Sequence, residues 1–162
     1  MRLTPLAALL LICTGAAWAG GTVSVSFIQP ERFSDAGERS YDYSPATLQK
    51  IEQHLQYLGQ RHLADGQVLK IEVTDVDLAG ELRPVPGRGD QVRIVRGKAD
   101  WPRFKLRYLL EADGQPIKQG EETLANLDYT HVLPDIGSYE PMRYERLLLE
   151  AWFKARFNAA SQ

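Results

Sequence analysis

Residues 67–81, QVLKIEVTDVDLAGE, limit the possible folds more than any other part of the chain. Apolar and polar residues alternate up to Thr74, which is the period-two pattern of a half-buried β-strand. After Thr74 the apolar positions shift by one residue, so that Val76 and Leu78 continue the buried face. Such a shift predicts a β-bulge within the strand. A strand of this length is best placed in the centre of a sheet, where both of its edges are paired.

Two helices and a shorter strand are predicted around this strand. Residues 23–27 alternate as a first strand that ends at Pro30. Ser44 and Pro45 are typical of a helix start, and four leucine and isoleucine residues at spacings of three and four follow them. Pro141 opens a second helix. We expect its buried stripe to consist of Leu147, Leu148, Ala151, Trp152 and Ala155, flanked by Leu149, Phe153 and Phe157.

Residues 103–125 predict a β-hairpin with the turn at Asp113-Gly114, a dipeptide favoured in type I′ turns. A two-residue turn alone would leave apolar residues of the first strand opposite charged ones. One extra residue at Gly120 brings Leu124 opposite Phe104 and places Glu121 opposite Arg107. We therefore predict a β-bulge at Gly120, because glycine tolerates a bulge most easily.

The element order β-α-β-β-β-β-α predicts an α+β fold. We expect a twisted, largely antiparallel sheet of about five strands with two helices on one face. Residues 92–96 form its third strand, and residues 83–90, RPVPGRGD, are interpreted as a loop. The helix between the first two strands allows them to pair in parallel. Since no repeat or linker divides the chain, residues 20–162 are expected to be a single domain.

The first 19 residues are typical of a secretory signal peptide. Arg2 precedes an apolar run that is too short to span a bilayer, and Ala17-Trp18-Ala19 provides a cleavage site. The only cysteine, Cys13, would be removed with this segment, so the mature chain would have no disulfide and no thiol chemistry. We therefore expect a periplasmic or secreted protein, with no membrane span after cleavage.

The charge balance and the motifs exclude several functional classes. The chain has 19 Lys and Arg against 21 Asp and Glu, which is too balanced to indicate nucleic acid as a partner. No catalytic motif or cofactor loop is present, so we expect no cofactor and assign no catalytic residue. His54 and His62 lie about 80° apart around their helix and converge poorly on one metal ion.

A polar cluster is predicted on one face of the sheet, from Asp75, Asp77, Arg103, Arg107 and Glu121. Asp75 and Asp77 do not fit a calcium loop, because Ala79 and Pro86 stand where ligands are required. The cluster is therefore either a cross-strand ladder of charges or a site.

The connection between the third and fourth strands is the best candidate for a binding surface. Arg96, Lys98, Asp100 and Trp101 are crowded there beside the loop at residues 83–90. Loops on a rigid sheet often carry binding groups, and tryptophan and arginine are enriched in binding hot spots. The alternative is that Trp101 closes the end of the core.

The strings IEVTDVDLAGELRP, RIVRGKADWPRFKLRYLL and EPMRYERLLLEAWF resemble the DUF3016 family of exported bacterial proteins. This resemblance implies an exported single domain and supplies no activity or catalytic residue. Our leading hypothesis is a non-enzymatic periplasmic binding or accessory module, whose partner is an unknown envelope protein or small ligand. The alternative is a small carboxylate-dependent hydrolase or carbohydrate-active enzyme.

Overall fold

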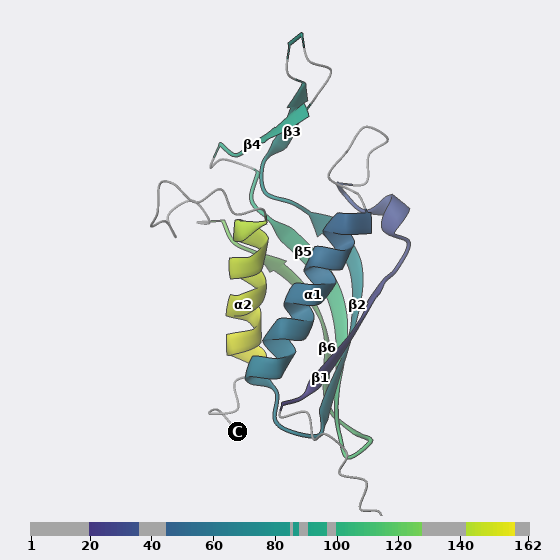
Figure 1. Cartoon of the computed structure of the whole chain (residues 1–162). Helices are drawn as coiled ribbons and strands as arrows, with labels where there is room; N and C mark the ends of the chain where they lie inside the picture. The colour runs from purple at the N-terminus through teal and green to yellow at the C-terminus, as the bar shows by residue number, and fades with distance from the viewer. Residues whose placement is uncertain are drawn as a thin grey trace, which may run out of the picture.

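Two helices cover one face of a curved four-stranded sheet (Figure 1). The computed structural model describes residues 20–35, 45–84, 86–87, 91–96, 100–127 and 142–157. The helices are α1 (Pro45–His62) and α2 (Arg143–Phe157). The sheet has the order β1-β2-β5-β6, formed by β1 (Thr22–Phe27), β2 (Gln67–Asp77), β5 (Arg103–Ala112) and β6 (Gln115–Ala125). The predicted α+β class is confirmed.

The long strand β2 lies in the interior of the sheet, as its sequence predicted. It pairs in parallel with β1 and antiparallel with β5. Its register with β5 shifts between Val73 and Asp75, so the bulge predicted at Thr74 is confirmed. Beyond the bulge Asp75 and Asp77 point away from the helices, because Val76 between them is buried. The strand ends at Asp77, four residues before the end that the pattern suggested.

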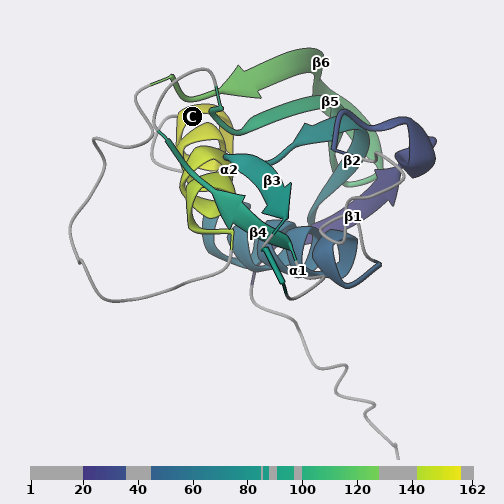
Figure 2. The ribbon, with the colours of Figure 1, turned by 90° about the horizontal axis from the view of Figure 1, so that it is seen from above.

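The main sheet has four strands and not the five that we expected. The segment predicted as its third strand is β4 (Gln91–Ile94), which pairs with β3 (Glu81–Pro84) in a separate two-stranded sheet. Part of the presumed loop at residues 83–90 therefore belongs to β3. Gly80 turns the chain out of the main sheet with a φ of +86°, a conformation that side chains resist. The resulting hairpin lies beyond one end of the helices (Figure 1), and in the view from above it is drawn in front of them (Figure 2).

The hairpin of β5 and β6 turns at Asp113-Gly114, as predicted. These two residues have φ angles of +51° and +74°, which a type I′ turn requires. Leu124 pairs with Phe104 and Glu121 pairs with Arg107, as predicted. The two-residue turn and the predicted partners of Glu121 and Leu124 are therefore confirmed.

The bulge in this hairpin is not at Gly120, where we predicted it. Gly120 pairs regularly with Tyr108, and Ile117 is instead the extra residue. Pro116 has no N–H to donate to the ladder, so a bulge beside it breaks few hydrogen bonds. A Cβ atom at Gly120 would lie 3.0 Å from the Tyr108 ring, so this glycine makes room for a side chain of the facing strand.

The core lies between the sheet and the two helices. The buried stripe of α2 is rotated from the predicted one, because Ala151 and Ala155 are exposed. The helix instead buries residues with larger side chains, whose burial removes more apolar surface from water. They are Glu145, Leu148, Leu149, Trp152, Phe153 and Phe157. The rings of Trp152 and Phe157 pack edge to face against Tyr108 of β5.

Candidate functional site

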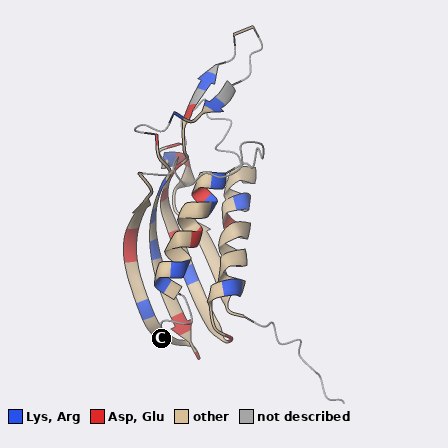
Figure 3. Cartoon of the chain, turned by 90° about the vertical axis from the view of Figure 1, so that its left-hand side faces the viewer, with Lys and Arg blue, Asp and Glu red and all other residues tan. Residues whose placement is uncertain are grey.

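The predicted polar cluster lies on the face of the sheet that the helices leave open. The even-numbered residues of β5 from Phe104 to Leu110 are buried under the helices. Arg103, Lys105 and Arg107 therefore point to the opposite face. Basic and acidic residues are interspersed along the strands (Figure 3).

The two aspartates of β2 are held by neighbouring groups. Asp77 forms an ion pair with Arg103 at 2.6 Å. Asp75 lies 3.2 Å from the Lys105 ammonium and accepts hydrogen bonds from the backbone and hydroxyl of Ser34, at 2.7 and 3.0 Å. Burial alone would raise the pKa of Asp75, but these hydrogen bonds and the lysine hold the pKa below its usual value.

Arg107 completes this row of charges. Its guanidinium lies 3.7 Å from Glu72, and Glu121 is its register partner on β6. Both Arg107 and Glu72 are about half exposed, so their attraction is weak. These contacts are those of a cross-strand charge ladder, the first of the two interpretations given above.

The predicted binding surface is placed at the base of the β3–β4 hairpin. The carboxylate of Asp100 accepts a hydrogen bond of 2.7 Å from the Arg96 backbone, and the Asp100 carbonyl accepts one of 2.8 Å from Gly80. Trp101 is half-buried and is not part of the core cluster. Lys98 lies outside the described residues. Asp100 thus ties the connection together, while the Arg96 side chain is exposed.

A buried group of charges that the sequence analysis did not single out lies beneath the same hairpin. Arg93 of β4 donates to the carbonyls of residues 78, 79 and 80 at 2.8–3.2 Å and pairs with Asp35 at 3.1 Å. Glu145, in the first turn of α2, is only 3% exposed. Its carboxyl accepts a hydrogen bond of 2.7 Å from the Ala79 backbone.

The two carboxyls of this group share the field of one guanidinium. Burial raises the pKa of Glu145, and the nearby Asp35 carboxyl adds to the effect. Burial likewise raises the pKa of Asp35, although Arg93 opposes the shift. Two carboxyls with one cation between them leave a negative charge uncompensated when both are ionised.

Glu145 also lines a cavity of about 390 Å³ between α1 and α2. The cavity has three apolar side chains in its lining, and the other six carry polar or charged groups. Exposed side chains of α1, such as Tyr57, form part of its wall and open it to solvent. Its lining consists of Lys50, Ile51, Gln53, His54, Tyr57, Met142, Glu145, Arg146 and Leu149.

The two helices that line the cavity run side by side in the same direction (Figure 1). His54 Nε2 lies 3.3 Å from the Arg146 carbonyl, and the His62 ring packs 6.1 Å from that of Phe153. Burial lowers the pKa of His62. In the sequence, Lys50, His54 and Tyr57 follow one another at spacings of four and three, which places them on one face of α1. The α2 residues that face them lie some 92 residues away in sequence.

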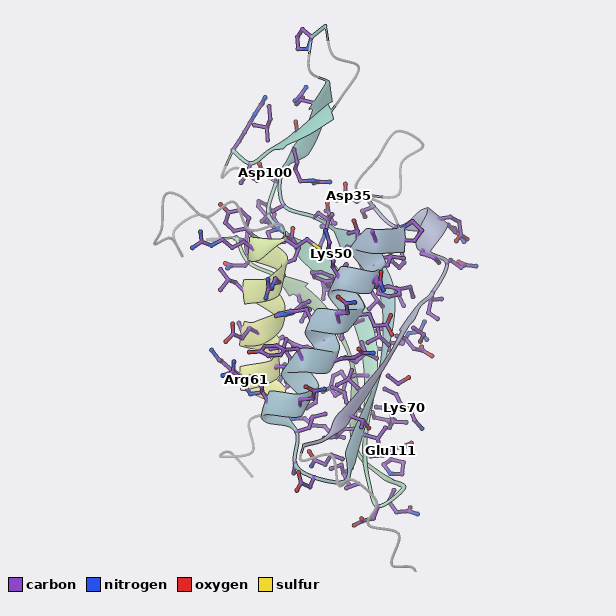
Figure 4. The ribbon with its side chains drawn as sticks, viewed as in Figure 1. Asp35, Lys50, Arg61, Lys70, Asp100 and Glu111 are labelled. Carbon is purple, nitrogen blue, oxygen red and sulfur yellow. The ribbon has the colours of Figure 1, made fainter. Side chains whose placement is uncertain are left out.

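Some of the labelled side chains in Figure 4 lie at opposite ends of the molecule. Asp35, Lys50 and Asp100 lie towards the β3–β4 hairpin, whereas Lys70 and Glu111 lie at the far end. The cavity and the buried charges therefore share one end. Within the described part of the chain, no group of three or more His, Cys, Asp or Glu could hold a metal ion. None of the helices described there is both long and apolar enough to cross a membrane.

Comparison with known proteins identifies the family. No curated protein and no solved structure matches the chain significantly. A family model described as a protein of unknown function, DUF3016, matches residues 21–155. This match spans the sheet, both sides of the cavity and the buried charges, so the chain belongs to the DUF3016 family.

Proposed function

We propose that this protein is an exported, periplasmic, non-enzymatic binding module that holds a small ligand between α1 and α2. The observation that carries the proposal is the cavity of about 390 Å³, which falls in the size range of small-molecule sites. Ile51, Met142 and Leu149 give it an apolar wall, and the polar and charged groups around that wall can fix the orientation of a ligand.

The make-up of the cavity favours binding over hydrolysis. A carboxylate-dependent glycosidase or similar hydrolase needs two carboxyls on either side of the bond that breaks. Glu145 is the one carboxyl among the lining residues that the structure describes, and the Ala79 backbone binds it. Asp75 and Asp77 are engaged with Lys105 and Arg103 on the open face of the sheet.

Filling the cavity should weaken binding strongly without unfolding the protein. Ligands would first be found by screening amino acids, organic acids, amines and sugars for those that raise the melting temperature. Gln53 is exposed and lines the cavity, so Gln53→Trp places an indole in it. We expect at least tenfold weaker binding of any compound found, measured by calorimetric titration.

Gln49→Trp is the matched control, because Gln49 is exposed on the same helix, one turn away, and does not line the cavity. It should bind as the unmodified protein does. Equal affinity in both variants would place the ligand elsewhere, and a screen without any binder would contradict the proposal.

The proposed export rests on the signal-like residues 1–19, which lie outside the described residues. The family match begins at residue 21, just beyond the predicted cleavage site. We expect mass spectrometry of protein isolated from the native cell envelope to find Gly20 as the first residue. A chain that still begins at Met1, or a lipid on Cys13, would contradict cleavage after Ala19.

A further inference from the structure

We propose that the cavity binds a small zwitterion with an apolar body, with its ammonium group at Glu145 and its anionic group at Lys50 and Arg146. This inference rests on the proposed function and adds to it the chemical class of the ligand. It follows from the signs, positions and burial of the groups that line the cavity.

The inner wall of the cavity favours a cation. Glu145 is 3% exposed, and a carboxylate has two oxygens that can accept about four hydrogen bonds. Arg93 is the cation that acts on Glu145, but it also pairs with Asp35 and binds three backbone carbonyls. An ammonium group beside Glu145 would supply a second positive charge for the two carboxyls, which share Arg93.

The outer wall favours an anion. Lys50 is exposed on α1, and Arg146 is exposed on α2 across the cavity. Among the described residues, Lys50 has no ion pair or hydrogen bond. A ligand with only a positive charge would meet these two cations, and a ligand with only a negative charge would meet Glu145. A molecule that carries both charges satisfies both walls.

The remaining wall is apolar and limits the size of the ligand. Ile51 and Leu149 are almost completely buried, and Met142 packs against the same core. A volume near 390 Å³ is at the small end of ligand cavities and suits one amphipathic molecule better than a peptide chain. An amino acid with an apolar side chain has the required groups, and the ethanolamine headgroup of a lipid has the same pair of charges.

Titration with L-leucine and its derivatives tests the arrangement of charges. N-acetyl-L-leucine lacks the ammonium, and L-leucine amide lacks the carboxylate. We expect L-leucine to bind at least tenfold more tightly than either derivative, measured by calorimetry or by amide chemical shifts in NMR. Glycerophosphoethanolamine is titrated in parallel, and tighter binding of that compound would assign the same site to a lipid headgroup.

Variants locate the two charged contacts. Lys50→Met should weaken L-leucine binding about tenfold and leave L-leucine amide unaffected, whereas Glu145→Gln should remove the preference for L-leucine over its N-acetyl derivative. Lys70→Met is the control, since Lys70 is exposed on the sheet far from the cavity and pairs with Glu111 (Figure 4). It should change nothing.

The outcomes separate this inference from the function on which it rests. Equal binding of L-leucine and N-acetyl-L-leucine would overturn the ammonium contact at Glu145. If neither zwitterion binds but another screened compound does, and Gln53→Trp abolishes that binding, the proposed binding function stands and the proposed zwitterionic ligand is wrong. If no compound binds at all, both proposals fail.

Discussion

Replacing Arg93 by Met should lower the free energy of unfolding by about 3 kcal/mol, because removal of one partner leaves a buried charge uncompensated. Arg93 is mostly buried, and its guanidinium binds three backbone carbonyls as well as Asp35. The substitution removes all of these hydrogen bonds at once. It also removes the cation that stabilises the ionised form of Glu145. Urea denaturation of the purified protein measures the loss.

The loss should depend on pH in a defined direction. A carboxyl whose pKa is raised on folding stabilises the fold below its unfolded pKa, and this stabilisation is lost as the pH rises through the folded value. Burial raises the pKa of Asp35 and Glu145, and the loss of Arg93 would raise both further. The effect of the substitution should therefore be largest at pH 7 and smaller near about pH 4, where carboxyls become protonated.

The control for this prediction is Arg83→Met in the same hairpin. Arg83 pairs with Glu81, and both side chains are about half exposed, so the pair is worth at most about 1 kcal/mol. Asp35→Asn in the Arg93→Met background should recover part of the lost stability. An Arg93→Met protein as stable as Arg83→Met would show that Arg93 does not hold the hairpin to the core.

Local patterns in the sequence predicted the sheet well. Alternation identified β2 and β5, and a one-residue shift identified the bulge next to Asp75, because the side-chain period of a strand leaves no other explanation. The Asp113-Gly114 turn was equally clear, since few residues adopt two successive positive φ angles. These features depend on neighbours in the sequence and can be recognised without the fold.

Features that depend on partners far away in the sequence could not be predicted. The separate pairing of β3 and β4 depends on where Gly80 directs the chain, and four-residue strands have little periodicity to recognise. The rotation of α2 depends on which side chains pack against the sheet. The spacing of apolar residues within the helix does not contain that information.

The candidate site was even harder to predict, because it is formed by residues far apart in the sequence. Glu145 has the sequence context of an ordinary exposed residue in a first helical turn, yet the end of β2 and the hairpin enclose it. Asp35 lies in a polar connection, and Arg93 is one of several arginines. Only the fold brings these three residues together. Sequence analysis instead favoured Asp75 and Asp77, whose spacing is conspicuous but whose charges are already paired.

Gly59→Ala should destabilise the protein by about 2 kcal/mol, although alanine is the better helix former. Gly59 is buried within α1, where the helix packs against β1. A Cβ atom at this position would lie 2.1 Å from a methyl group of Val23, so the strand or the helix must move. Overpacking of this kind costs about 1–3 kcal/mol, and a contact this close falls at the upper end. The higher helix propensity of alanine returns about 1 kcal/mol.

A double-mutant cycle with Val23→Ala isolates the contact. Val23 is β-branched and has little freedom to rotate away, whereas alanine at this position removes the methyl group that a new Cβ would meet. The double variant should therefore be more stable than Gly59→Ala alone by at least about 1 kcal/mol, a coupling that distant residues do not show. Gln60→Ala, the next residue and exposed, should change the stability by less than about 0.5 kcal/mol. If Gly59→Ala proves more stable than the original protein, helix propensity outweighs packing and β1 does not lie so close to α1.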